Sequence, residues 1–153
     1  MADGSAALRF GGPEDLDAAA TLLATVRRAS FPAIPPSVHD DEVELVPYLA
    51  SLLHQGAEVV LAEEAGVLLG VMVVHGAVIE QLAVATEAQA NGIGRQLIHF
   101  ALEQSTQPMT LWTFQSNTAA QGFYLNLGFT EIARTDGDNE EGEPDMCFRS
   151  FQV

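Results

Sequence analysis

The sequence is poor in cysteine, in basic residues and in long apolar runs. Cys147 is the only cysteine among 153 residues, so no intrachain disulfide can form, which favours a reducing compartment such as the cytoplasm. Six basic residues stand against 21 acidic ones, and the net charge of −15 argues against binding to nucleic acid or to an anionic membrane. The longest apolar run, Val67 to Val74, is interrupted by Gly70 and is too short to span a bilayer. The opening MADGSAALRF lacks the apolar segment of a signal peptide.

Signatures of metal sites and of common nucleotide-binding loops are missing as well. The Gly-Lys-Ser/Thr of a P-loop does not occur. A Rossmann fingerprint needs a third glycine where Leu97 stands, and an acidic residue about 20 positions later, and neither is found. No metal site is predicted, because ligand spacing is absent among His39, His54, His75 and His99.

The apolar periodicities predict a mixed α/β fold (α+β in some schemes) in a single domain, residues 1–153. The expected order is a strand, two helices, three strands, a helix, a strand, a helix and two final strands. The sheet is expected to have about seven strands, mostly antiparallel, with helices on both faces. Pro47 is expected to kink the second helix or to delay its start. The expected strands are 6–10, 57–64, 67–75, 77–84, 109–114, 129–135 and 146–151, and the expected helices are 13–29, 40–55, 93–102 and 118–127.

The joint after the apolar strand Ile79–Val84 has the composition of a phosphate-binding loop. Gly92 and Gly94 let the backbone approach a ligand closely. Unpaired N–H groups at the start of the next helix, together with its dipole, attract a phosphate. Arg95 adds a forked cationic donor. An ordinary strand-to-helix turn is the alternative interpretation.

The pattern Gln-x-x-Gly-x-Gly after a Leu-Ala-Val strand resembles the pyrophosphate loop of the GNAT superfamily of acyl-CoA-dependent N-acyltransferases. The segment Leu111–Phe129 resembles the same family in its order of residue types. Its matching positions are Asn117, Ala120, Phe123, Tyr124, Gly128 and Phe129. The resemblance implies the GNAT fold, with acetyl-CoA as cosubstrate and no metal. It also implies acetyl transfer to a primary amine of a small molecule or peptide, by direct attack in a ternary complex. A catalytically inactive acyl-CoA sensor of the same fold is the alternative.

The resemblance implies that acetyl-CoA is held largely by backbone groups. The strand at Leu82–Val84 is expected to bond to the pantetheine arm, and an N–H near Leu82 to hold the oxyanion. Asn117 has a second interpretation as the N-cap of the helix that follows it. The expected acetyl-CoA-binding residues are Leu82, Ala83, Val84, Gln89, Ala90, Asn91, Gly92, Ile93, Gly94, Arg95, Gln96, Asn117, Ala120, Phe123 and Tyr124.

Two side chains are expected to handle protons. Tyr124 is the predicted general acid, because a phenol with a pKa of about 10 stays protonated at neutral pH. A core aromatic is its other interpretation. Glu80 is the predicted base toward the amine, with an exposed strand carboxylate as the alternative. His75, Asp145 and Glu141 are weaker candidates for the base.

The acceptor is not identified by the sequence. The acidic excess is compatible with a cationic amine and equally with a role in solubility alone. Residues 136–145 contain six acidic residues in ten and are predicted to form a solvated loop, which either recruits a cationic substrate or has no binding role. Neither nucleic acid nor a membrane is an expected partner, and the chain is expected to be a monomer or a homodimer.

Overall fold

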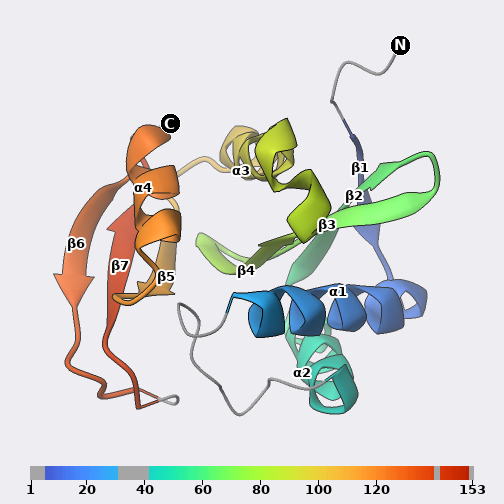
Figure 1. Ribbon diagram of the computed structural model, residues 1–153, viewed down its shortest axis with the longest axis horizontal. Coiled ribbons are helices and arrows are strands. Elements are labelled where there is room, and N and C mark those ends of the chain that lie inside the picture. Colours follow the sequence, from blue (N-terminus) through green and yellow to red (C-terminus); the bar gives the residue numbers. More distant parts are fainter. Residues whose placement is uncertain (1–5, 31–41, 140–141, 152–153) are drawn as a thin grey trace.

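The computed structural model describes residues 6–30, 42–139 and 142–151, which form a seven-stranded sheet with four α-helices (Figure 1). The elements follow the predicted order. The strands are β1 (Ala7–Gly11), β2 (Glu58–Glu64), β3 (Val67–His75), β4 (Val78–Val84), β5 (Thr110–Phe114), β6 (Thr130–Arg134) and β7 (Asp145–Arg149). The α-helices are α1 (Leu16–Ala29), α2 (Glu42–His54), α3 (Ile93–Gln104) and α4 (Thr118–Asn126). Short 3-10 helices, η1 (Pro13–Asp15) and η2 (Thr86–Asn91), precede α1 and α3.

The strands lie in the order β1-β2-β3-β4-β5-β7-β6. All neighbours are antiparallel except β4 and β5, which are parallel, so the predicted mixed and mostly antiparallel sheet is confirmed. Helix α2 includes Pro47 and already begins at Glu42, so the proline does not delay its start. Asp40 and Asp41, which were expected to begin this helix, lie outside the described residues.

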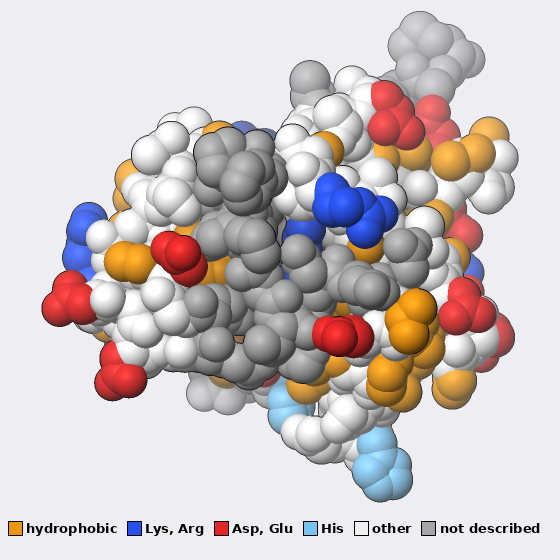
Figure 2. All heavy atoms as spheres, turned by 60° about the horizontal axis from the view of Figure 1, so that its bottom comes forward, with side chains coloured by type: hydrophobic (Ala, Val, Ile, Leu, Met, Phe, Trp, Pro, Cys, Tyr) orange, Lys and Arg blue, Asp and Glu red, His pale blue; other side chains and the backbone are white. Residues whose placement is uncertain are grey.

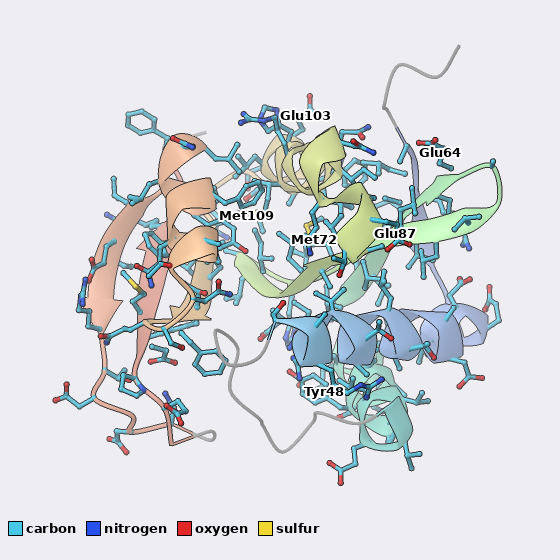
Figure 3. All side chains as sticks on the ribbon, viewed as in Figure 1. Tyr48, Glu64, Met72, Glu87, Glu103 and Met109 are labelled. Atoms are coloured by element: carbon cyan, nitrogen blue, oxygen red, sulfur yellow. The ribbon has the colours of Figure 1, made fainter. Side chains whose placement is uncertain are left out.

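Helices cover both faces of the sheet, as predicted. On one face, α1 and α2 bury an apolar core against β2, β3 and β4, with Leu23, Leu45, Leu49, Val59 and Val71 among its members. On the other face, α3 and α4 bury a second core, with Met72, Leu97, Met109, Tyr124 and Phe148 among its members. Figure 3 shows Met72 and Met109 inside this second layer. In the described part of the chain, no helix has the length and apolarity needed to cross a bilayer.

The sheet is split between β4 and β5. Among the described residues these strands pair only at Val78 with Thr110 and at Ile79 with Leu111. Beyond that point β4 stays with β3 as far as Val84, while β5 stays with β7 as far as Phe114. The two halves of the sheet therefore diverge, and an opening lies between the ends of two adjacent parallel strands.

Candidate functional site

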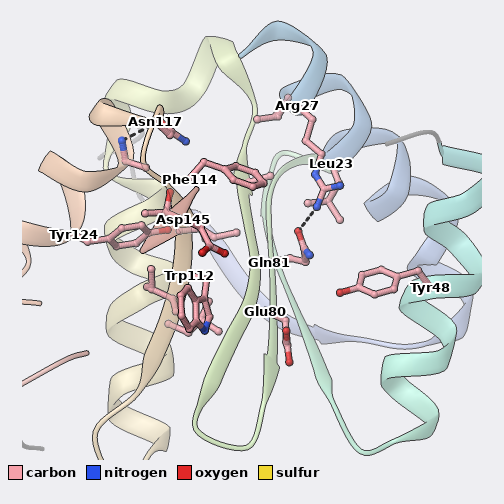
Figure 4. A pocket seen from close by; sticks show the side chains of 17 residues that line it. Leu23, Arg27, Tyr48, Glu80, Gln81, Trp112, Phe114, Asn117, Tyr124 and Asp145 are labelled. Carbon is pink, nitrogen blue, oxygen red and sulfur yellow. Dashed lines mark hydrogen bonds between the residues drawn. The ribbon is translucent and has the colours of Figure 1, made fainter. Parts of the chain in front are cut away.

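A cavity of about 300 Å³ occupies the split between β4 and β5 (Figure 4). Tyr124 of α4 and Asn117, which precedes this helix, line one part of its wall, and Arg27 of α1 and Tyr48 of α2 line another. Helices α4 and α1/α2 pack on opposite faces of the sheet. The cavity therefore connects both faces, so a ligand on one face can meet a ligand on the other.

The edge of β4 that faces the cavity carries unpaired backbone groups. The Ala85 N–H donates to the Leu69 carbonyl of β3 at 2.8 Å, so the backbone groups of Ala85 point toward β3. Because antiparallel residues alternate in the direction of their hydrogen bonds, the backbone groups of Leu82 and Val84 point away from β3. The β4–β5 ladder ends before Leu82, so no described strand pairs with its N–H and C=O. An N–H donor is thus available at the position that the sequence analysis expected.

The start of α3 has the geometry of an anion site. Gly92 adopts the left-handed conformation, with φ at +81°, and no side chain caps the helix. The N–H groups of the first turn therefore lack a capping acceptor. A Cβ at Gly94 would lie 3.2 Å from the Phe123 Cζ, so glycine here lets α3 and α4 approach closely. Arg95 is exposed beside this turn.

Two glutamines of the predicted loop have structural roles. The Gln89 Nε2 donates to the Val84 carbonyl at 3.0 Å, which ties the end of β4 to η2. Gln96 bonds the backbone of Ala6 twice, since its Oε1 accepts from the Ala6 N–H at 3.1 Å and its Nε2 donates to the Ala6 carbonyl at 3.2 Å. The side chain of Gln96 is therefore occupied, so we leave this side chain out of the proposed binding site, and a role of its backbone stays a prediction. Asn91 is exposed at the end of η2, which also contains Ala90.

The core interpretation of Tyr124 is confirmed, and its role as a general acid stays a prediction. Its side chain is buried, and its ring centroid lies 5.2 Å from that of Phe123, 5.7 Å from that of Phe129 and 6.0 Å from that of Phe148. Its hydroxyl points into the cavity (Figure 4) and makes no hydrogen bond to a described residue. Burial raises the pKa of Tyr124 to about 12. The hydroxyl therefore stays protonated and is presented to a ligand.

Asn117 is the N-cap of α4. Its Oδ1 accepts a hydrogen bond from the Ala120 N–H at 3.2 Å, which confirms the capping interpretation. Asn117 and Ala120 also line the cavity. A role of either residue in binding acetyl-CoA stays a prediction.

Glu80 sits at a β-bulge. The register of β3 with β4 shifts between Val73 and Val74, which leaves Glu80 without a partner in β3. Such a bulge changes the direction of a side chain at the edge of a site. The Glu80 side chain is 31% exposed and lines the cavity, and its Oε2 lies 3.9 Å from the His75 Nδ1. Glu80 is thus only partly exposed and faces the proposed site.

The structure adds cavity residues that the sequence analysis did not assign. They include Arg27, Gln81 and Trp112. The Arg27 Nη2 donates to the Gln81 Oε1 at 2.6 Å. A signal for Arg27 was present, because a cation stands in the apolar stripe of the first helix. Of the weaker base candidates, Asp145 is buried in the cavity wall and Glu141 lies outside the described residues.

The acidic excess is dispersed over the visible surface. Figure 2 shows Asp and Glu side chains at separate places on this face rather than in one continuous patch. Among the described residues, no group of three or more His, Cys, Asp or Glu side chains is arranged to hold a metal ion.

Comparison with known proteins identifies the family. The acetyltransferase (GNAT) domain matches residues 55–131, which is half of the chain. The chain therefore belongs to the GNAT acetyltransferase family, as its resemblance indicated. Among curated proteins, none matches the sequence.

Solved structures share the fold at low sequence identity. The apo form of YjaB from Escherichia coli is 21% identical, with 96% of this chain and 98% of that chain covered and a TM-score of 0.75. YncA from Salmonella typhimurium, a putative acetyltransferase solved with its cofactor acetyl-CoA, is 20% identical, with 96% and 93% covered and a TM-score of 0.73. A variant of the spermidine N-acetyltransferase SpeG from Vibrio cholerae is 21% identical, with 95% of both chains covered and a TM-score of 0.70. These likenesses establish the GNAT fold.

Proposed function

We propose that this GNAT-family protein, as a single domain, transfers the acetyl group of acetyl-CoA to a primary amine by direct attack in a ternary complex. One observation carries the proposal. The unpaired edge of β4 at Leu82 faces a cavity that also holds the Tyr124 hydroxyl and the Glu80 carboxylate. Acyl transfer to an amine needs these three kinds of group, namely a donor for the developing negative oxygen, a donor for the departing sulfur and a base for the ammonium.

Acetyl-CoA fits the groups available along this path. The uncapped first turn of α3 offers N–H donors for its pyrophosphate, with Arg95 beside them. The split offers the N–H and C=O of Leu82 and the N–H of Val84, which point toward the space between the strands. Bound there, acetyl-CoA supplies an acetyl group activated as a thioester. The solved structure of YncA with acetyl-CoA is consistent with this assignment.

The side chains and backbone have separate tasks in this scheme. The Leu82 N–H donates to the thioester oxygen as negative charge develops there, and removing one such donor typically lowers kcat by about 10²–10³-fold. Glu80 accepts a proton from the ammonium, directly or through water, since only a neutral amine is nucleophilic.

Tyr124 acts toward the departing sulfur. A thiol such as that of cysteine has a pKa of about 8.5, well below the value of about 12 for Tyr124. Complete transfer of the phenol proton to a thiolate would therefore be uphill. We expect the Tyr124 hydroxyl to stabilise the departing thiolate by donating a hydrogen bond, which refines its predicted role as a general acid. The thiolate takes up the proton that the attacking nitrogen loses as the amide forms, so CoA leaves as the thiol.

The acceptor is proposed to be a primary amine of a small molecule or peptide. Two structural neighbours are named for such acceptors, a spermidine N-acetyltransferase and a ribosomal-protein-alanine N-acetyltransferase. Their low identity to this chain leaves the acceptor to be found by experiment.

The test is a screen of primary amines with acetyl-CoA, in which thiol release and the mass of the acetylated amine are both measured. The chain contains no lysine, since its six basic residues are all arginines, so lysine self-acetylation cannot contribute to the signal. Turnover of any amine supports the proposal. Binding of CoA without turnover of any amine would favour the sensor. CoA binding that NAD or ATP displaces equally well would contradict the assignment of the site.

A further inference from the structure

One buried carboxylate in the cavity has no role in the proposed reaction. Asp145, the first residue of β7, is only 9% exposed and lines the cavity together with Glu80. Burying an ionised carboxylate is unfavourable unless hydrogen bonds or an opposite charge compensate it. The surroundings of Asp145 therefore indicate what it is built to bind.

The chain fixes one oxygen of this carboxylate and leaves the other facing the cavity. The Thr135 Oγ1 donates to the Asp145 Oδ1 at 2.6 Å. The Gln115 Nε2 holds the same turn by donating to the carbonyls of Thr135 and Asp145, at 2.9 and 3.1 Å. The Asp145 Oδ2 makes no hydrogen bond to a described residue, and the carboxylate faces the cavity in Figure 4. The position of the charge is thus set before any ligand arrives.

Asp145 points toward the α1/α2 face of the sheet. Its neighbour Met146 packs in the core under α3 and α4, and successive strand residues point to opposite faces. The same alternation from Leu111, which is in that core, places Trp112 and Phe114 on the side of Asp145. An anionic oxygen beside aromatic rings is an environment suited to an organic cation.

Among the described residues that line the cavity, two carboxylates stand against one guanidinium, which is an excess of negative charge. Glu80 lies on β4, across the split from Asp145 on β7. The single guanidinium among the described lining residues, that of Arg27, donates to Gln81. Two carboxylates on different strands thus face one cavity, whereas the proposed reaction uses only one as a base.

We propose that Asp145 determines specificity by binding a second cationic group of the acceptor, so that the favoured acceptors are primary amines with a further ammonium or guanidinium group. This inference rests on the proposed function, because Glu80 is assigned to the amine that reacts. Asp145 itself touches the other end of the acceptor and takes no proton from the reacting nitrogen.

The test measures amine binding in the presence of CoA, where no turnover occurs. Titration calorimetry compares 1,3-diaminopropane, 1,4-diaminobutane and 1,5-diaminopentane with the monoamine of the same length. Wild-type protein should bind at least one diamine more tightly than its monoamine. Asp145→Asn should weaken that diamine about 10- to 100-fold, as expected for a hydrogen bond to a charged group. The affinities for the monoamine and for CoA should be unchanged, because asparagine can still accept from Thr135.

Asp136→Asn is the matched control. Asp136 is an exposed residue between β6 and β7, so its substitution removes the same charge outside the cavity. It should leave the preference for the diamine unchanged. An equal loss in both variants would mean that the net charge, not the position of Asp145, selects the ligand, and would overturn the inference.

Other outcomes separate this inference from the proposed function. Equal binding of every diamine and its monoamine by wild-type protein overturns the inference, even if Asp145→Asn does not fold. Diamine binding that depends on Asp145, without acetylation of any amine, would support the inference while the proposed function fails. Acetylation of monoamines and diamines with equal kcat/KM, in wild type and Asp145→Asn alike, would leave the function standing and remove the specificity.

Discussion

Replacing Tyr124 by phenylalanine separates the two roles of this residue. The substitution keeps the ring that packs against Phe123, Phe129 and Phe148 and removes only the hydroxyl. The hydroxyl has no hydrogen-bond partner in the part of the chain that the structure describes, so no internal hydrogen bond is lost. The free energy of unfolding at neutral pH should therefore change by less than about 1 kcal/mol.

The rate of acetyl transfer should fall while the affinity for CoA is kept. A hydrogen bond from Tyr124 to a negatively charged sulfur would contribute about 1.5–3 kcal/mol, which corresponds to about 10- to 150-fold in rate. This range lies at the low end of general acid catalysis, because a phenol with a pKa of about 12 does not give up its proton completely. A fall in kcat with an unchanged CoA dissociation constant is the mark of an interaction made in the transition state.

The raised pKa of Tyr124 also predicts a difference in alkaline stability. The folded state holds the phenol proton more tightly, with a pKa of about 12 against about 10 in the unfolded chain. Below pH 10 the phenol is protonated in both states, and as the pH rises from 10 through 12 the free energy of unfolding falls, because the unfolded chain ionises first. At about 1.4 kcal/mol per pH unit, the total is about 3 kcal/mol. Over this range wild-type protein should lose stability more steeply than Tyr124→Phe.

Single-turnover acetyl transfer to an amine found in the screen is the deciding assay. Denaturant unfolding at several pH values accompanies it, and calorimetry gives the CoA affinity. If Tyr124→Phe transfers the acetyl group at the wild-type rate, with chemistry shown to be rate-limiting, the catalytic role is refuted and Tyr124 is a core aromatic only. A parallel loss of CoA affinity and stability would instead indicate disturbed packing.

Three further predictions follow from the loop, the glutamines and the charge. Gly92 and Gly66 have φ angles of +81° and +79°, and a side chain at either position would meet no neighbouring atom at its Cβ. Valine should therefore destabilise the protein at each position only through backbone strain, by about 1–2 kcal/mol. Only Gly92→Val should also weaken CoA binding in a calorimetric titration, and equal effects on CoA would contradict the phosphate role of the loop. Gln96→Leu should lower the free energy of unfolding by about 1–3 kcal/mol through its lost bonds to Ala6. CoA affinity should persist there, and its loss at unchanged stability would return Gln96 to the binding site. If the charge of −15 steers a cationic amine, kcat/KM should fall with added salt, because screening acts beyond about 8 Å at 0.15 M. A flat profile would leave that charge a solubility feature.

Local pattern was sufficient for the order of the elements and for the glycine joint before α3. The spacing at which apolar residues recur distinguishes strands from helices, and the order of elements that it predicted is the one observed. The position of Gly92 could also be predicted, since a glycine at a strand-to-helix joint is a local signal, and the structure places it in the left-handed region.

Features that depend on pairing between distant strands were not predictable. The bulge at Glu80 arises from the register of β3 against β4, which the sequence of one strand does not reveal. Asp145 appeared to belong to a solvated acidic loop, yet β7 pairs with β5 and thereby brings Asp145 into the cavity wall. The bonds of Gln96 to Ala6 join residues 90 positions apart. Each of these features is non-local, so periodicity and motif spacing carry no signal for it.

The split in the sheet has a mechanical consequence. Two residue pairs join β4 to β5 in the described chain, and the core under α3 and α4 contains residues from both halves, among them Met72 and Phe148. Apolar contacts are not directional, whereas a backbone ladder fixes its partners at one spacing. In the part of the chain that the structure describes, a slight rotation of the halves about the short ladder, as about a hinge, would break no backbone hydrogen bond outside that ladder. The width of the opening could then change at little cost in free energy. A ligand that bonds to both edges would hold the two halves of the sheet at one separation.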